Sequence, residues 1–466
     1  MTLYLNVYII FSQINTNFQR ESAALACRRF KGKHSYDKIA EMIHDIHCEF
    51  KLDAKKVVKV TTDNASNMVK AFTMFSQNNQ IDLDNNDNDD SDDDFIIQNI
   101  TEGTTGDTDF MSDIFLPVHQ RCASHTINLL ITVDIKAALT GPSSGNSGGN
   151  YSRSYHSSFG KCSAIWNLTS RSPKAAETYA DITGKASSSP CVTRWNSTFD
   201  CLNDLMIVKQ FLGSVCDALD LPKFKETDFE FLAEYIECVK PIAEALDRLQ
   251  GEKNCFYGEL LPVLLQTQKN LQKLQYRHLK YCAKLVIVLL EGLYKRFSNY
   301  FDFSSRVNDA ILAAVSHPFF KLRWVPKERK NDVKELLINE AECLKKLNFV
   351  PKTRNLINIS EVTSTFFSFE GGSSSDESIT NTSVKNTIEL QCLQYLQDEG
   401  TCLDMLNKFP IVKEVFIKYN TALPSSAPVE RLFSYGGMIM RPNRRSMHDD
   451  IFEKQLLLKA NSAFIK

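Results

Sequence analysis

Residues 55–64 read KKVVKVTTDN, a run of β-branched residues that ends in an acid and an amide. Such a run predicts a buried strand, and the following NMVKAF, from Asn67, can begin a helix. A carboxylate at the end of a buried strand lies at the edge of a sheet, where ligands bind in open α/β folds. Asp63 is therefore a candidate metal ligand, although an Asp-Asn pair also simply turns the chain.

The segments before this strand continue the alternation of strand and helix. Residues 2–11 and 22–30 have the pattern of strands. The stretch from Tyr36 to Phe50 predicts a helix, because its apolar residues recur at helical spacing, and Ser35 is a suitable N-cap. This apolar face consists of Ile39, Met42, Ile43, Ile46 and Phe50.

The segments after the strand add one more strand and then mostly helices. PVHQ leads into CASHTINLLITVD, which predicts a strand followed by a helix. The pattern from Asn203 to about Leu347 is helical almost throughout, and further helices end the chain. This order predicts an α/β fold with a large all-helical insertion.

Composition limits the classes of function. The chain has 466 residues with a net charge of −2, and its run 82–94 holds eight Asp, so the remainder is mildly basic and compatible with nucleic-acid contact. The 13 Cys include no Cys-x-x-Cys pair, which argues against a zinc finger and favours reduced thiols in the cytosol or nucleus. The apolar opening MTLYLNVYIIF is too short to span a bilayer, so no membrane partner is expected.

Three linkers divide the chain. The acidic loop 82–113 is too charged to pack, and the segments 140–158 and 369–383 are rich in Gly and Ser. We expect three units, with the acidic loop and the 140–158 linker inside the first: residues 1–202, 203–385 and 386–466.

Two internal motifs have both a chemical and a structural interpretation. In RCASHTINLL, Cys122 and His125 supply two metal ligands, which is only half of a zinc site; the favoured interpretation is a buried thiol and a hydrogen-bonded His that hold helix to sheet. In CVTRWNSTFDCL, Arg194 is suited to a phosphate and Trp195 to a base. The alternative is a Trp in the core with Arg as surface cover.

The C-terminal stretch SSAPVERLFSYGGMIMRPNRRSMHDD carries the last candidates. Pro428 fits the first helical position and places Glu430 in the first turn, where the helix dipole alone favours an acid. Gly436 and Gly437 are expected to end or kink this helix. A small basic patch follows, formed by Arg441, Arg444 and Arg445.

The final helix is predicted to start from a capping pair, Ser446 with Asp449. Phe452, Leu456 and Phe464 form an apolar stripe on it. That stripe requires a partner, which is either the chain's own core or a second chain.

Taken in order, these motifs resemble those of the hAT (hobo–Activator) transposases and of the host proteins derived from them. TTDNASNM, CASHTINLL and TRWNSTFD resemble the catalytic core, and LNKFP followed by SSAPVERLFSYGG resembles the C-terminal dimerisation region. The resemblance implies an RNase H-like core interrupted by a helical insertion, with 386–466 completing the core.

The resemblance also implies a site in which two Asp and one Glu hold two divalent metals, Mg²⁺ in an active enzyme. Asp63 corresponds to the second acid and Glu430 to the third. Cys122 and His125 correspond to the family's Cys-x-x-His, and Trp195 to an aromatic that stacks on a DNA end. No Asp or Glu precedes Glu21, so the first acid has no counterpart, and the core is expected to be N-terminally truncated.

These observations lead to one expected function and one alternative. The expected function is a nuclear, catalytically inactive hAT-derived protein without a cofactor. It would form a homodimer or higher homo-oligomer through Phe433, Phe452 and Leu456, and it would contact DNA. The alternative is an active, Mg²⁺-dependent DNA transposase.

Overall fold

The structure is a computed structural model, and it describes residues 6–30, 32–53, 56–76, 114–140, 148–191, 195–348, 376–440 and 447–464. Most of these residues are helical, and two small sheets accompany them. The expectation of an α/β chain with a large helical part is therefore confirmed at this level.

Strands β1 (Asn6–Ile14) and β2 (Arg20–Arg29) form an antiparallel hairpin. Its register shifts between Ile9, which pairs with Ala26, and Ile10, which pairs with Ala24, so Leu25 is a bulge. Strands β3 (Val60–Thr62) and β4 (His119–Arg121) pair in parallel. β3 is shorter than the expected strand, and its residues are half-buried.

Helices cover both faces of the β1–β2 hairpin. α1 (Tyr36–Glu49) and α2 (Ser66–Phe75) enclose a cluster on one face that includes Val7, Phe30 and Phe72. On the other face, α16 (Ala427–Ile439) and α17 (Asp449–Ala460) pack against Ala24 and Cys27. Neighbouring residues of β1 alternate between these clusters, as the pleat of a strand requires.

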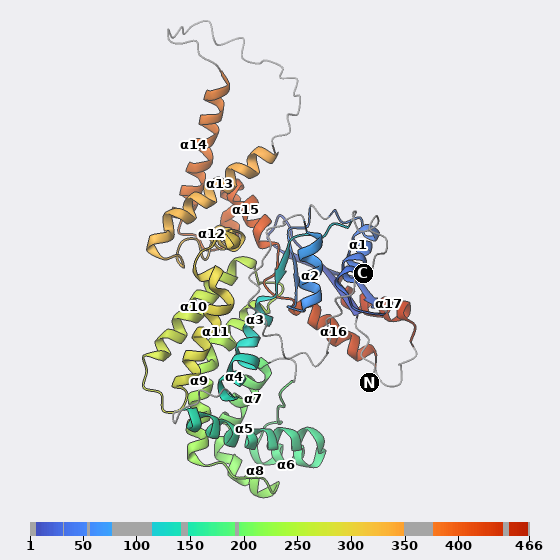
Figure 1. Ribbon diagram of the computed structural model, residues 1–466, viewed down its shortest axis with the longest axis vertical. Helices are drawn as coiled ribbons and strands as arrows, with labels where there is room; N and C mark the ends of the chain where they lie inside the picture. The colour runs from blue at the N-terminus through green and yellow to red at the C-terminus, as the bar shows by residue number, and fades with distance from the viewer. Residues whose placement is uncertain are drawn as a thin grey trace, which may run out of the picture.

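The remaining helices share one large apolar cluster. Figure 1 shows them stacked along the long axis of the molecule, with the strands to one side beside α1, α2, α16 and α17. The bounds are α3 (Ala123–Leu129), the π-helix η3 (Leu130–Asp134), α4 (Ile135–Thr140), α5 (Gly148–Arg171), α6 (Pro173–Thr183), α7 (Trp195–Ile207), α8 (Leu212–Ala218), α9 (Glu226–Leu249), α10 (Leu260–Gln275), α11 (Ala283–Phe301), α12 (Asn308–Ser316), α13 (Lys330–Asn348), α14 (Asp376–Gln397) and α15 (Pro410–Asn420).

The helical part begins earlier than expected. α5 starts at Gly148, so the linker expected over 140–158 does not extend past residue 147. Tyr151 is buried and contacts Phe231 of α9, and Phe159 contacts Tyr235 of the same helix. These contacts explain why a Gly/Ser-rich segment is helical. α5, α6 and α7 thus share the large apolar cluster with the later helices, across the boundary expected at residue 202.

The helical part also ends later than expected. Val412 and Phe416 of α15 have 0% exposure and lie in the large cluster, which therefore continues past the boundary expected at residue 385 as far as Ala422. The hairpin reaches into this cluster through Phe18, whose ring lies 5.8 Å from that of Phe416. Asn420, also fully buried, accepts from Gly258 N at 2.9 Å and donates to Ala313 O at 3.0 Å.

Candidate functional site at the junction of the two parts

Asp63 follows β3 directly, as the sequence predicts. Its side chain is exposed, and Oδ1 lies 3.4 Å from Ala65 N, a weak hydrogen bond of the kind that turns a chain into a helix. The interpretation of Asp63 as a turn residue therefore accounts for the geometry, and its role as a metal ligand stays a prediction for a carboxylate that is exposed at the end of the strand.

The neighbouring strand β4 brings a half-buried histidine, His119, beside this end of β3. The His119 ring stacks on Phe72 at 4.8 Å, and its Nε2 lies 2.8 Å from Thr62 Oγ1. Burial lowers the pKa of His119 to about 4, so the imidazole is neutral at physiological pH. The sequence patterns did not single out this residue, although its place in the predicted strand PVHQ was a usable signal.

Cys122 is the N-cap of α3, and its thiol is a hydrogen-bond acceptor at the centre of the junction. The buried Sγ accepts from the backbone N–H of His125 and from that of Ser426, each at 3.3 Å. The structural interpretation of Cys122 and His125 therefore accounts for the geometry. In the ranges that the structure describes, no group of three or more His, Cys, Asp or Glu side chains is arranged to hold a metal ion.

The segment before α16 joins both strands of the small sheet. Leu423 O accepts from Thr61 Oγ1 at 2.9 Å and from Gln120 Nε2 at 3.3 Å. Pro424 O accepts from Ala123 N at 2.9 Å. Three motifs that are far apart in the sequence, 60–68, 121–130 and 423–430, therefore meet at one place.

Glu430 lies in the first turn of α16, as predicted, and is half-buried. Its N–H donates to Ser426 O at 3.2 Å, and Ser426 N donates to Cys122 Sγ. The helix continues to Ile439, so Gly436 and Gly437 neither end it nor kink it. A Cβ on Gly436 would lie 3.1 Å from the Tyr8 hydroxyl, so the glycine lets α16 approach β1 closely.

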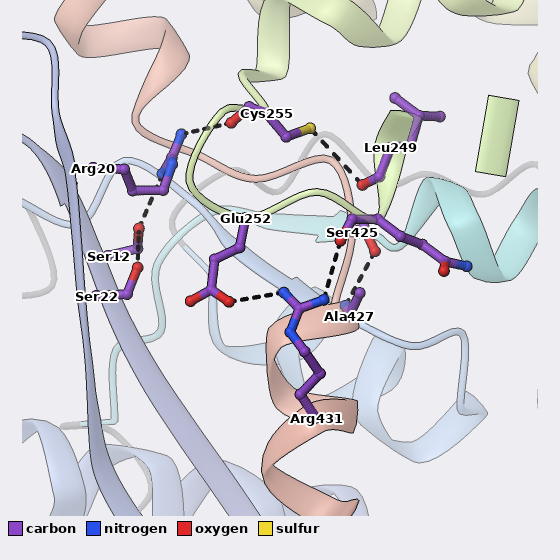
Figure 2. A network of polar contacts seen from close by, with 10 residues as sticks. Ser12, Arg20, Ser22, Leu249, Glu252, Cys255, Ser425, Ala427 and Arg431 are labelled. Carbon is purple, nitrogen blue, oxygen red and sulfur yellow. Dashed lines mark hydrogen bonds and ion pairs between the residues drawn. The ribbon is translucent and has the colours of Figure 1, made fainter. Parts of the chain in front are cut away.

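Two arginines, Arg20 and Arg431, connect the place where these motifs meet to the loop after α9 (Figure 2). Arg431 donates to Gln250 O at 3.2 Å and pairs with Glu252 at 2.8 Å. Arg20 donates to Cys255 O at 3.3 Å and to Asn420 O at 2.8 Å. Burial lowers the pKa of Arg20 to about 10, which still leaves it charged at neutral pH.

Three other candidates lie away from solvent. Trp195 is 9% exposed in the core of the helical part, so the core interpretation is correct and its ring is not placed to stack on DNA. Phe452 and Leu456 are 5% and 0% exposed against β2. The chain itself covers these two residues, so assigning them to a dimer interface was wrong, whereas Phe464 of the same predicted stripe is 60% exposed.

The arginines predicted to contact DNA are not among the residues that the structure describes. Arg194, Arg441, Arg444 and Arg445 lie outside the described residues, as does Ser446. α17 begins at Asp449 after His448, without a side-chain cap. Among the described helices, none is both long enough and apolar enough to cross a membrane.

Magnesium prefers carboxylate oxygens, and Asp63 and Glu430 would supply two of them at this junction. Two carboxylates fall short of the ligand set of a two-metal centre. Comparison with known proteins adds no assignment, since neither a family model nor a curated protein matches this chain.

Proposed function

We propose that this chain is an hAT transposase-derived protein that self-associates through its C-terminal helices and contacts DNA in the nucleus. The observation that carries the proposal is the meeting of three motifs at Cys122, because residues 60–68, 121–130 and 423–430 belong to three of the four stretches on which the family resemblance rests; the fourth, 191–202, lies in the helical part. Thr61, Ala123 and Ser426 take part in the hydrogen bonds that join them.

The outer faces of α16 and α17 support self-association. Phe433 and Met438 on α16 are 45% and 47% exposed, and Ile451 and Leu458 on α17 are 48% and 59% exposed. Exposed large apolar side chains on two adjacent helices favour an interaction surface. We call these four residues the outer apolar face; of the residues expected at an interface from the sequence, it retains Phe433.

Size measurement tests this part of the proposal. Light scattering should give the wild-type chain the mass of a dimer or higher oligomer at micromolar concentration, and Phe433→Ser/Leu458→Ser the mass of a monomer. Leu390→Ser is the matched control, because Leu390 on α14 is 56% exposed and lies on the helical part. A monomeric wild-type chain, or a double variant that still associates, would contradict the proposal.

The proposed DNA contact rests on the basic residues Arg441, Arg444 and Arg445 between α16 and α17, and on Arg194. Arginines that contact phosphate release counterions, so binding should weaken steeply with salt. Replacing the three C-terminal arginines by Gln should reduce both the affinity for duplex DNA and its salt dependence, measured by fluorescence anisotropy. An unchanged affinity would exclude these arginines from the contact.

A second candidate function is Mg²⁺-dependent strand cleavage and transfer. It is favoured by the exposed carboxylate of Asp63 and by the hydrogen bonds that join Thr62 to Cys122 and Cys122 to Ser426, which bring the segments that carry Asp63 and Glu430 to one place. Incubation with terminal inverted-repeat DNA and Mg²⁺ decides between the two candidates. Cleavage that is lost in Asp63→Asn would favour the enzyme, and intact DNA with the wild-type chain would favour the binding protein.

A further inference from the structure

The outer side of α1 carries a histidine and a cysteine one helical turn apart. His44 Nε2 lies 3.5 Å from Cys48 Sγ. Cys48 is exposed and His44 is half-buried, so both are accessible from solvent. Residues four apart lie above one another on a helix, which explains why the two side chains meet.

The opposite side of α1 fixes the helix in place. Ile39, Ile43 and Ile46 are 5%, 5% and 2% exposed. Phe50 N donates to Ile46 O at 3.0 Å and Leu52 N donates to His47 O at 2.8 Å, which secures the last turn. The Cα positions that carry His44 and Cys48 are thus set by a packed helix and not by a loop.

The distance between the two atoms fits a tetrahedral metal ion. Zinc binds thiolate sulfur at about 2.3 Å and imidazole nitrogen at about 2.0–2.1 Å, so two such ligands around one tetrahedral ion stand about 3.6 Å apart. The observed separation of 3.5 Å needs almost no adjustment. Thiolate and neutral imidazole are also the ligand types that borderline-soft divalent cations prefer.

We propose that His44 and Cys48 form a two-ligand site for Zn²⁺ or a similar borderline-soft divalent cation. On binding, the thiol of Cys48 gives its proton to solvent as the sulfur–metal bond forms, His44 binds as the neutral imidazole, and water fills the other positions.

Neighbouring groups do not enlarge the site. The carboxylate of Glu49 is held by Arg28 at 2.8 Å, and His47 is 7% exposed on the packed side of the helix. Two ligands supply about half the binding of a four-ligand zinc site, which corresponds to a dissociation constant of about 1–100 µM. Such a site exchanges its metal readily.

Titration of the full, reduced, metal-free chain with Co²⁺ tests the proposal, because cobalt reports its ligands by absorption. We expect one Co²⁺ per chain with a thiolate-to-metal charge-transfer band, displaced by Zn²⁺. Cys48→Ser should lose the band, and His44→Gln should weaken binding at least tenfold. Cys402→Ser is the control, since Cys402 is another exposed cysteine and should leave the band unchanged.

The readout separates a metal site from a simple His–Cys hydrogen bond. Circular dichroism of each variant verifies folding, which solvent-accessible substitutions should preserve. Absence of a charge-transfer band in the folded wild-type chain, or a band that persists in Cys48→Ser, would overturn the proposal. A band lost with Cys48 but unaffected by His44→Gln would also overturn it, because cysteine would then bind alone.

Discussion

Two parts of this protein are stabilised in different ways. The helical part contains the large apolar cluster, and the hairpin part consists of the strands β1–β4 with α1, α2, α16 and α17 (Figure 1). One apolar cluster runs through the helices from α5 to α15, whereas the β1–β2 hairpin separates two small clusters, one under α1 and α2 and one under α16 and α17. Buried apolar area is the main source of stability, so the two small clusters give the hairpin part less hydrophobic stabilisation than the large cluster gives the helical part.

The hairpin part compensates with polar contacts along its edges. Asn461 exchanges two hydrogen bonds with the backbone of Ala24, at 2.9 and 2.8 Å, and Glu453 accepts from Cys27 N at 2.9 Å. Side chains at the C-terminal end of the chain thus take the place of a neighbouring strand beside β2. An edge strand left open would attract other chains.

The largest expected effect lies in the helical part. Gly258→Ala would put a Cβ 2.3 Å from Ala313 O and 2.8 Å from Asn420 Oδ1, and neither backbone nor buried amide can move aside. We expect a loss of about 4 kcal/mol of unfolding free energy or more, measured by urea denaturation.

The matched variant for this test is Gly437→Ala. A Cβ on Gly437 meets nothing within 4 Å on the exposed side of α16. Alanine in a helix should stabilise the protein by about 0.5–1 kcal/mol. Equal effects of the two substitutions would show that the packing around Gly258 is not as described.

The second effect compares two leucines of α17. Leu456 is 0% exposed and Leu458 is 59% exposed. Leu456→Ala should cost about 2–5 kcal/mol of unfolding free energy, because it opens a cavity against β2. Leu458→Ala should cost almost nothing in the monomer and should weaken self-association. The reverse pattern, measured by thermal unfolding and light scattering, would contradict the assignment of inner and outer faces.

The smallest expected effect is a pH dependence shared by the two parts. Burial lowers the pKa of His119 in the hairpin part and of His317 in the helical part from 6.5 to about 4. The unfolded chain binds these protons first as the pH falls, so the stabilisation is complete above pH 6.5 and is lost toward pH 4.

When the pH is lowered from 7 to 5, the shifted pKa of each histidine should reduce the unfolding free energy by about 2 kcal/mol. His119→Gln should remove the part of this pH dependence that comes from His119 and leave the part that comes from His317. Urea denaturation at the two pH values measures this. A variant with the full wild-type pH dependence would show that His119 is already protonated, or exposed, in the folded protein.

Local patterns predict much of the fold. The predicted bounds of α1 agree with the structure to within one residue at the C-terminal end, because five apolar residues at helical spacing leave no other element. Asp63 after a strand and Glu430 in a first turn are also predictable, since both follow from neighbouring residues. α5 is missed although Tyr151, Phe159 and Trp166 have helical spacing, because the Gly and Ser around them dominate the composition.

Local patterns do not predict the long-range contacts at the junction of the two parts. Arg20 donates to carbonyls 235 and 400 residues away, and a backbone acceptor leaves no mark in the sequence. Trp195 beside an arginine suits a core and a DNA surface equally, so burial alone could decide. The stripe of Phe452 and Leu456 likewise requires a partner, and the sequence does not say that β2 provides it.

In the described residues the chain folds its own helix α17 onto the hairpin, and under the proposed function the outer apolar face is the surface that meets a second copy. Hydrogen exchange in protein dilute enough to be monomeric tests this most directly. The backbone amides of α17, and those of Ala24 and Cys27, should exchange far more slowly than in an unfolded chain. Exchange at the unfolded rate at this dilution, with protection only on association, would contradict the claim.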